Sequence, residues 1–473
     1  MAKLRSLAAL AVATTLAACA VGPDYHAPET EVPRSFVGAE PTSFTAHPAD
    51  IARFWTVFGD PTLDTLVADA LRANHDLRIA VAQLDEARAL RGAARLDLAP
   101  TVTAGGGYTE QLLSASQAAG TGGAREVKGY DAGLDAFWEL DLFGRARRAL
   151  EASNAELDAA QASLADAQVA VTAELSRSYF ELRGEQQRLA VAQRNVENQS
   201  QSLQLTNARL EAGSGTELDT SRAQAQLAAT RATIAPLEAS VARIIHRIGV
   251  LTGREPNALR EQLALPADLP RVPLLAAVGD PAQLLRRRPD IRVSERELAA
   301  ATARIGIAVA DLFPHVSFTG GLGLAATRFD DLGEGGTGTR LIAPGISWAA
   351  FDLGRVRAQI RAARARNEGA LASYEQTVLR ALQETEDALV THARARERLV
   401  QLAESADASR TAARLARLRF ENGAVDFLQV LDAERTLLLA EDGLAQGRAD
   451  TATSLVAVYK ALGGGWQAPQ SGG

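Results

Sequence analysis

The fold is decided by a stretch that the sequence carries twice, as Trp138-Glu-Leu-Asp-Leu-Phe-Gly-Arg145 and as Trp348-Ala-Ala-Phe-Asp-Leu-Gly-Arg355. The two tryptophans stand 210 positions apart. On their C-terminal side this offset aligns Glu174 with Glu384, Gly213 with Gly423 and Leu218 with Leu428. On their N-terminal side an offset of 214 aligns Asp76 with Asp290, Pro100 with Pro314 and Gly106 with Gly320. A register this constant indicates two copies of one structural unit.

Each copy is predicted to contain a first helix, two strands and a long helical hairpin. The apolar spacing places the first helices at roughly 63–98 and 281–312, where Pro100 and Pro314 end them. The strands are expected within about 100–141 and 313–352, and the long helices within about 144–250 and 354–462. We therefore assign 19–62 to an N-terminal anchor and linker, 63–280 to the first repeat, and 281–473 to the second repeat with its C-terminal tail.

The long helices carry apolar side chains at every seventh position, as coiled coils do. In the first copy the stripe includes Leu182, Leu189, Val196, Leu203 and Leu210. No strong helix breaker precedes the glycine turn at 213–215, so residues 145–210 would form a helix of ~100 Å. The turn reverses the chain, and each copy ends in an antiparallel helix pair. The returning helix contains Pro236 in the first copy only, and we expect a local kink there.

The strands alternate apolar and polar side chains. Leu134, Ala136 and Trp138 fall on one face, and Asp135 and Glu139 fall on the other. Two strands per copy give four per chain, which is too few to close a membrane barrel. An open sheet edge in lipid leaves backbone groups without partners, so strands that enter a membrane imply a barrel shared by several chains. The alternative is a small soluble sheet beside a helical bundle.

The N-terminus has the pattern of a secretory signal. Lys3 and Arg5 precede a short apolar run that ends in Leu16-Ala-Ala-Cys19. This ending resembles the bacterial lipobox, which implies removal of residues 1–18 and acylation of Cys19. Ala20 follows the cysteine and, by resemblance to known lipoproteins, favours the outer membrane. An ordinary signal peptide with an incidental cysteine is the alternative.

No catalytic, metal or cofactor site is predicted, and we expect no enzyme activity. The six histidines are scattered along the 473 residues and form no metal-binding motif. The glycine-rich stretches 105–107 and 333–338 lack the Lys-Ser/Thr pair of a phosphate-binding loop. A net charge of −7 with both signs interspersed argues against a nucleic-acid partner.

The chain resembles the outer-membrane factors of tripartite efflux systems, in the lipoprotein subgroup similar to the pseudomonad drug-efflux channels. Besides the two tryptophan stretches, the matching segments follow one another along nearly the whole chain. They are Cys19-Ala-Val-Gly-Pro-Asp-Tyr25, Leu284-Leu-Arg-Arg-Arg-Pro-Asp-Ile291, Ala310-Asp-Leu-Phe-Pro314, Val430-Leu-Asp-Ala433 and Tyr459-Lys-Ala-Leu-Gly-Gly-Gly-Trp466.

The resemblance implies a mainly α fold with a small β part, in which the four strands contribute to a 12-stranded barrel shared by a homotrimer. It implies a helical tunnel across the periplasm and a collar built near 40–62, 250–288 and 458–473. The channel would be passive, anchored in outer-membrane lipid, and would export small molecules such as drugs from an inner-membrane pump through a periplasmic adaptor protein. A duct for type I protein secretion or for metal ions, and a structural coiled-coil lipoprotein, remain as alternatives.

The resemblance also implies a gate at the hairpin tips. Asp426 matches an acidic gate position of similar relatives, and Asp432 matches a second acid of more distant ones. Gln429 stands where those distant relatives carry an acid, and Thr216 and Asp219 are weaker candidates. One carboxylate from each chain at a narrow axis would form a negative ring that attracts cations.

Each acidic candidate has an alternative, purely structural role. Asp426 follows the Gly423 turn at the position of a helix N-cap, and Asp432 stands three residues before Arg435, as in a surface ion pair. Phe420 replaces a tyrosine whose hydroxyl bonds across helices in the distant relatives, so that lock is expected to be absent.

Overall fold

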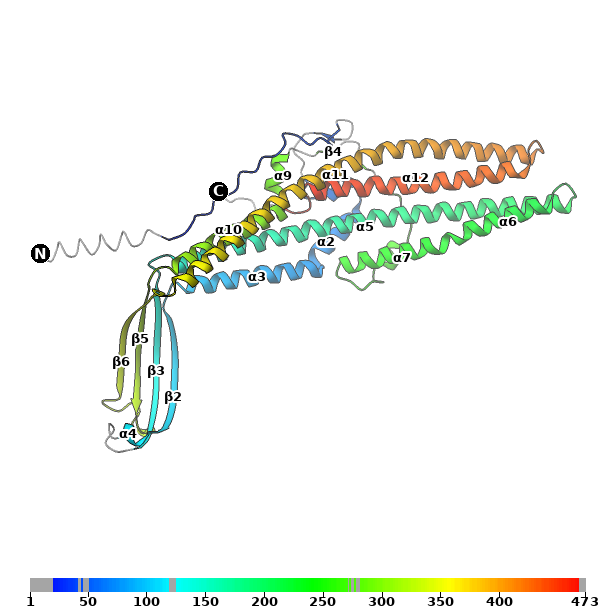
Figure 1. Cartoon of the computed structure of the whole chain (residues 1–473). Helices are drawn as coiled ribbons and strands as arrows, with labels where there is room; N and C mark the ends of the chain where they lie inside the picture. The colour runs from blue at the N-terminus through cyan, green and yellow to red at the C-terminus, as the bar shows by residue number, and fades with distance from the viewer. Residues whose placement is uncertain are drawn as a thin grey trace. The chain divides into compact units, whose positions relative to one another are not determined.

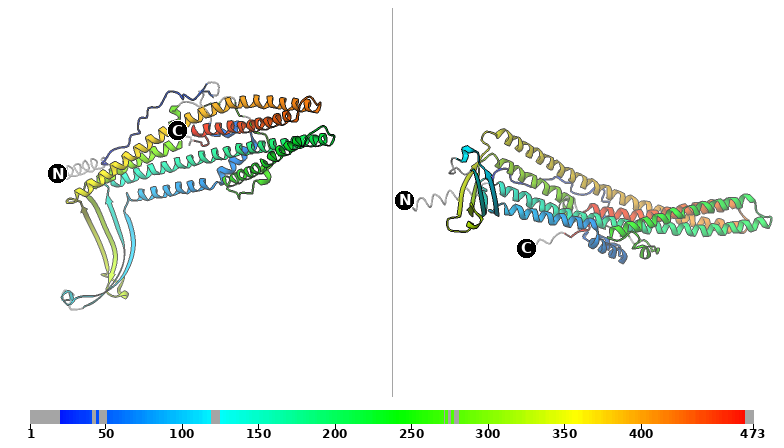
Figure 2. Two further views of the ribbon diagram at one scale, coloured as in Figure 1. Left: turned by 45° about the vertical axis from the view of Figure 1, so that its right-hand side comes forward. Right: turned by 90° about the horizontal axis from the view of Figure 1, so that it is seen from below.

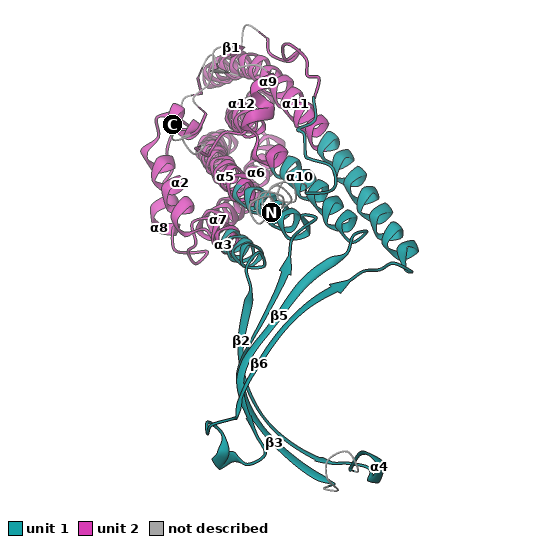
Figure 3. Cartoon of the chain, turned by 90° about the vertical axis from the view of Figure 1, so that its left-hand side faces the viewer, with its two compact units in different colours: residues 1–29, 83–161, 293–376 teal, residues 30–82, 162–292, 377–473 magenta. Residues whose placement is uncertain are grey.

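The computed structural model describes residues 20–40, 44–45, 51–118, 125–270, 272–273, 276–277 and 281–467. The expected signal peptide and Cys19 lie outside them. The chain forms two compact units, which Figure 3 distinguishes by colour. Unit 1 comprises residues 1–29, 83–161 and 293–376, and unit 2 comprises residues 30–82, 162–292 and 377–473. Each unit contains corresponding parts of both repeats, so the repeat boundaries stay a prediction.

The chain is mainly helical with a small antiparallel sheet, which confirms the predicted fold class. The elements of the first repeat are α2 (Pro61–Ala73), α3 (His75–Leu96), β2 (Thr101–Leu112), α4 (Ala115–Ala118), β3 (Glu126–Leu140), α5 (Arg145–Glu211), α6 (Glu217–Ala232), α7 (Ile234–Leu251) and α8 (Arg260–Leu263). Those of the second are α9 (Pro281–Arg287), α10 (Pro289–Ala310), β5 (His315–Ala326), η3 (Phe329–Asp331), β6 (Gly338–Ser347), α11 (Leu353–Glu421) and α12 (Phe427–Ala461). A short parallel pair joins β1 (Phe44–Thr45) to β4 (Ala276–Ala277), and η1 spans Phe54–Phe58.

The prediction of one continuous first helix in each repeat was wrong. Asn74 separates α2 from α3, and Arg288 separates α9 from α10 at the equivalent position. Pro289 disfavours a helical backbone at the residue before it, and Asn74 instead accepts bonds from the first backbone amides of α3. The residues at the two breaks make equivalent contacts. Asn74 Nδ2 donates to Leu251 O (2.9 Å), and Arg288 Nη1 donates to Ala461 O (3.0 Å). Each break thereby ties the first helices to the end of the returning helix.

The sheet lies in unit 1, and its four strands run side by side in the order β2-β3-β5-β6 (Figure 1). All three pairings are antiparallel. Thr101 lies opposite Phe137 between β2 and β3, and His315 lies opposite Ser347 between β5 and β6. The repeat offsets convert the first pair into the second, so the two copies pair their strands in the same register.

One face of the sheet is apolar and exposed, because the registers bring the even-numbered residues of all four strands to the same side. Its large exposed side chains are Val102, Tyr108, Leu112, Leu134, Phe318, Leu322, Leu324, Ile342 and Ile346. The other face carries Asp135 and several glycines, with Phe137 and Leu341 as its large apolar exceptions. The alternation predicted around Leu134 is therefore confirmed.

The repeated tryptophans anchor the strand ends. Trp138 Nε1 donates to Leu98 O (3.1 Å), and Trp348 Nε1 donates to Leu312 O (2.9 Å). In the first copy the next residues start the long helix. The Asp141 carboxylate accepts bonds from the backbone amides of Ala146 and Arg147 in the first turn of α5, at 3.0 Å each. This contact satisfies donors that no helical carbonyl can reach.

Unit 2 contains most of two helical hairpins, α5 with α6–α7 and α11 with α12, and Figure 2 shows each returning helix alongside its long partner. The return is broken at Thr233 in the first hairpin and continuous in the second. Pro236 lacks the N–H that would bond to Ala232, which accounts for the break. The predicted kink is confirmed.

The segments expected in the collar contact one another in unit 2. Gly465 N donates to Ile51 O (3.0 Å), and Trp466 Nε1 donates to Arg287 O (3.2 Å). The rings of Phe54 and Tyr459 stack with their centroids 5.3 Å apart.

Within the described ranges, no helix combines the length and the apolar character needed to cross a bilayer.

Candidate gate at the helical tips

The two hairpin tips have the same backbone. Gly213 and Gly423 both adopt a positive φ of 72°, which glycine tolerates best. Behind each glycine, an amide bonds back into the helix that is ending. Ser214 N donates to Arg209 O (2.9 Å), and Ala424 N donates to Arg419 O (2.8 Å). This six-residue closure is a Schellman turn, and it sets where each returning helix begins.

Thr216 and Asp426, which stand at equivalent positions, cap the returning helices. The Thr216 hydroxyl accepts from Asp219 N (3.2 Å) and donates to Asp219 Oδ2 (2.7 Å). Asp426 Oδ1 accepts from Gln429 N (3.3 Å). The structure therefore contains the capping role that was the alternative for Asp426. The cap uses one oxygen and leaves the charge of this exposed carboxylate in place.

Asp432 lies apart from these caps. Its side chain is exposed, and no ion pair links it to Arg435 within the described chain. The surface pair that was the alternative role for Asp432 is thus not formed in the described chain. Gln429 is also exposed, and its backbone amide supplies the contact to Asp426. The structure thus joins Asp426 to Gln429 and Thr216 to Asp219, while Asp432 is free for contacts outside the chain.

Phe420 has no hydroxyl to bond across helices as the tyrosine of distant relatives does. It makes a different contact between the helices. It is buried in a cluster with Phe427, Val430 and Ala223, which brings together α11, α12 and α6. The guanidinium of Arg209, on α5, lies 4.1 Å from the centre of the Phe420 ring. Arg209 Nη2 also donates to the Phe420 carbonyl (2.6 Å). A cation on a ring face and at the C-terminal end of a helix is stabilised by both.

A buried ion pair above the tip was not predicted. Glu434, on α12, is only 5% exposed. Its Oε1 accepts from Arg417 Nη2 (2.6 Å) on α11 and from the Ser202 hydroxyl (2.8 Å) on α5. The sequence did offer a signal, because Glu434 falls between Val430 and Leu437 in the apolar heptad stripe. A charge at such a position needs a buried partner.

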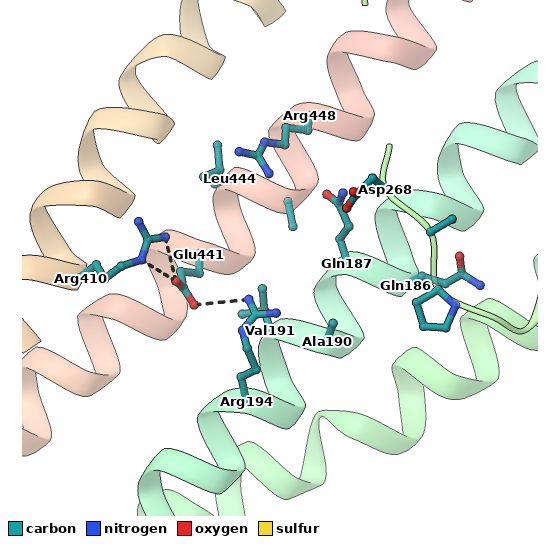
Figure 4. Close-up of a pocket in the computed structure, with 13 residues that line it drawn as sticks. Gln186, Gln187, Ala190, Val191, Arg194, Asp268, Arg410, Glu441, Leu444 and Arg448 are labelled. Atoms are coloured by element: carbon teal, nitrogen blue, oxygen red, sulfur yellow. Dashed lines mark hydrogen bonds and ion pairs between the residues drawn. The ribbon is translucent and has the colours of Figure 1, made fainter. Parts of the chain in front are cut away.

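A second charged contact borders a cavity of about 440 Å³ between α5 and α12 (Figure 4). Glu441 Oε1 accepts from Arg410 Nη2 (2.9 Å), and its other oxygen lies 3.8 Å from Arg194 Nη2. One step further along, Arg188 Nε donates to Asp442 Oδ1 (2.8 Å). Together with the Glu434 and Arg209 contacts, these form a series of polar links along α5. Each link joins the first hairpin to the second.

The model of the outer membrane efflux protein family matches residues 66–254 and again 281–464. The chain belongs to this family. The two matches follow the two repeats. This family of outer-membrane efflux channels is the one that the sequence motifs resembled.

Relatives and solved structures agree with the assignment. The antibiotic efflux pump outer membrane protein ArpC of Pseudomonas putida is 33% identical over 470 residues, which are 98% of this chain and 96% of the relative. The outer-membrane channel OprN is 45% identical, with a TM-score of 0.87 over 95% of this chain and all of the other. The open state of the MtrE channel of Neisseria gonorrhoeae is 30% identical, with a TM-score of 0.82 over 95% of this chain and 99% of the other. As a member of this family, the chain is an outer-membrane efflux channel.

The channel has no recognisable metal site in the part that is described, where histidine, cysteine and carboxylate side chains nowhere gather in threes.

Proposed function

We propose that three copies of this chain form one passive outer-membrane duct in a tripartite efflux system. The duct would receive small molecules from an inner-membrane pump through a periplasmic adaptor and release them outside the cell. The names of relatives support this cargo class, since they include an antibiotic efflux protein and the toluene efflux pump outer membrane protein TtgC of Pseudomonas putida. Nothing in the described chain favours a secreted protein or a metal ion as cargo.

The sheet carries the proposal. Its large apolar side chains lie on one exposed face, and in the described sheet β2 and β6 are paired on one side only. In lipid, unpaired backbone groups are costly, so these two edges need partners. Three copies would bring together 12 strands with the apolar face toward lipid, which is the arrangement that the family resemblance implies.

The repeat also predicts how the copies join. Within the chain, β3 of the first repeat pairs with β5 of the second, and Gly133 lies opposite Gly323. The same junction must recur between copies if the barrel closes evenly. Applying the repeat offsets places β6 of one copy beside β2 of the next, with Ala343 opposite Thr109 of that next copy.

A bilayer recording tests the duct. Purified full-length protein is sized by native mass spectrometry and then inserted into a planar lipid bilayer. We expect a mass of three chains and discrete conductance steps. A protein that remains a single chain in detergent and produces no conductance would contradict the proposal.

The gate is proposed at the tips, with Asp426 as its main acidic residue and with Asp432, Gln429, Thr216 and Asp219 near it. The exposure of Asp426 at a capped turn supports this assignment. The Asp426→Asn variant keeps one capping oxygen and removes the charge. We expect it to open the closed channel more often and to lower its preference for cations. Unchanged conductance and closed-state occupancy would remove Asp426 from the gate.

The anchor is proposed at Cys19, which would carry acyl chains after cleavage of residues 1–18. The mass of the mature protein tests this directly, because acylation adds the lipid mass to a chain that begins at residue 19. A mature chain with the bare peptide mass would contradict the assignment.

A further inference from the structure

The segment that follows Cys19 is held in a fitted site of unit 1. Val21 N donates to Phe143 O (3.1 Å). Arg148, near the start of α5, returns three bonds to the same segment. Its Nε donates to Val21 O (3.1 Å), and its Nη2 donates to Gly22 O (3.4 Å) and Asp24 Oδ1 (2.7 Å). The Arg148 side chain is only 4% exposed, whereas its partner Asp24 is 77% exposed, so the guanidinium is buried and the carboxylate faces water.

Glycines allow the segment to lie directly against the backbone. A Cβ on Gly306 of α10 would come within 2.8 Å of the Arg148 side chain, and one on Gly22 would come within 2.5 Å of Gly306 Cα. A Cβ on Gly144 would stand 2.6 Å from Ala20 Cα. Gly22 and Gly144 also have positive φ angles, of 97° and 82°. A side chain at Gly22 or Gly144 would displace the segment from its place, and one at Gly306 would displace the Arg148 side chain that holds it.

Tyr25 completes the site. Its hydroxyl donates to Glu295 Oε1 (3.0 Å), and its ring packs on the small face formed by Ala155, Ala299 and Ala300. The guanidinium of Arg296 lies 5.4 Å from the centre of the same ring. The segment is thus fixed at both ends, by Arg148 and by Tyr25.

The repeat shows that the fold itself does not require this site. In the other copy, Ala358 stands at the position of Arg148, and Gly92 stands at the position of Gly306. A Cβ on Gly92 or on Gly354, the counterpart of Gly144, would meet nothing within 4 Å. Only one of two equivalent places along the chain is therefore built to hold the segment.

We propose that Arg148, Gly306 and Gly144 form a clamp that fixes the point at which the acylated Cys19 enters the membrane. The inference rests on the proposed acylation of Cys19. Ala20, whose Cα lies against Gly144, is the residue that follows Cys19 in the chain. Since β3 ends four residues before Gly144, the acyl chains enter lipid beside the ends of the strands. Arg148 acts here as a positioning residue.

The charge of Arg148 suits this role. A buried guanidinium needs carboxylate partners, and it has two, since Nη1 donates to Glu151 Oε2 at 2.7 Å and Nη2 bonds to Asp24. Glu151 lies on the same helix and would pair with Arg148 whether or not the segment were present. The bonds to Val21, Gly22 and Asp24 are the part that depends on the segment.

Hydrogen–deuterium exchange of the full-length trimer in lipid nanodiscs tests the clamp. The variants are Arg148→Met and Gly306→Ala, with Gly92→Ala as the matched control in the other repeat. We expect the Val21 amide, which donates to Phe143 O, and its neighbours in 20–25 other than Pro23 to exchange at least about tenfold faster in the first two variants. Arg148→Met loses bonds from a charged donor, and the new Cβ in Gly306→Ala displaces the Arg148 side chain. Gly92→Ala should exchange at the wild-type rate. Asp24→Asn, at an exposed side chain, gives a smaller acceleration without disturbing the helices. Wild-type protection in Arg148→Met would overturn the proposal.

A second readout separates positioning from general stability. The Pro23→Cys variant offers one free thiol, because the thiol of Cys19 is acylated, and a spin label there reports its depth in the bilayer. We expect one narrow depth in the parent, a broad distribution with Arg148→Met, and a return toward the parent with Arg148→Lys. Equal depth distributions in all three would overturn the proposal.

The anchor and the clamp fail in different ways. A Cys19→Ser chain, exported with a non-lipoprotein signal, lacks acyl chains but keeps every contact of Arg148, so we expect protected amides at 20–25. Loss of protection in this chain would mean that the lipid holds the segment, which contradicts the clamp. A wild-type chain without acyl mass but with protected amides would instead contradict the proposed anchor, and with it the role of the clamp in placing lipid.

Discussion

Glu434 is a carboxylate in the middle of a helical core, and its partners come from two other helices. Replacing it with glutamine keeps the shape but leaves Arg417 without a counter-charge. Arg417 is about one-third exposed, so water offsets part of the loss. We expect Glu434→Gln to lower the local opening free energy of the tip by about 1–3 kcal/mol. Hydrogen exchange of peptides from 198–206 and 413–438 measures this opening free energy.

Asp432 provides the control for this experiment, two residues away on the same helix. It is exposed and has no ion pair in the described chain, so Asp432→Asn should change the opening free energy by less than about 0.5 kcal/mol. Equal effects of the two variants would show that the buried pair does not hold the tip.

His392 is a buried titratable group in α11. Burial, helped by Arg396, lowers its pKa from 6.5 to about 4. The unfolded chain binds a proton between these pH values and the folded chain does not. The stability that the folded state gains from a neutral His392 is therefore fully present above pH 6.5. It is lost as the pH falls toward 4, by up to about 3 kcal/mol. Hydrogen exchange of the backbone amides near 392 and 454 measures this loss of stability.

The His392→Gln variant isolates this titration from the carboxylates that also protonate in acid. The difference between the opening free energies of the parent and of His392→Gln should change with pH only in the window from about 6.5 to 4. A difference that is independent of pH would contradict the assignment.

The sequence predicted part of the candidate site for a physical reason. The cap at Asp426 was predictable from its spacing after Gly423, because a helix cap depends only on residues that are close in sequence. Ser202, Arg417 and Glu434 are far apart in the chain, so their meeting depends on helix packing. The ring contact between Arg209 and Phe420 also joins the two hairpins, and no pattern within either hairpin indicated it.

Among the elements, the returning helices offer a matched pair of variants. Pro236 stands in the broken return of the first hairpin, and Gln446 stands at the same place in the unbroken α12. Pro236→Gln restores an amide donor for Ala232, and we expect α6 and α7 to merge, with slower exchange at 232–238. Gln446→Pro should break α12 and cost about 3 kcal/mol. Unchanged exchange in both variants would mean that Thr233, and not proline, sets the break.

The strands and the hairpin tips were predictable because each is marked twice by the same residues. The first helices were not, because their breaks lie inside an apolar pattern that continues past them. Asn74 and Arg288 share no chemistry that the sequence could match. They share a function, since each donates to the last turn of a returning helix, and only the folded chain brings that acceptor close.

At the scale of the whole molecule, the repeat and the compact unit are different divisions. The repeat follows sequence order, whereas each compact unit combines corresponding parts of both copies. Strand pairing explains the difference: β3 of one copy pairs with β5 of the other over 11 residue pairs. The internal junction is therefore as extensive as the hairpin pairings inside each copy.

The same junction supplies a test of the assembly. If β6 pairs with β2 of the next copy as β3 pairs with β5, then Ala343 faces Thr109 across two chains, at the position that Gly133 and Gly323 occupy within one chain. Directly opposed residues of an antiparallel pair are close enough for a disulfide. Under oxidation, the Ala343→Cys, Thr109→Cys double variant should run as a covalent trimer in denaturing gels. The Ala343→Cys, Gln111→Cys pair, shifted by two residues on the same face, should remain monomeric. Crosslinking of the shifted pair alone would mean that copies meet in a different register from the repeats within one chain.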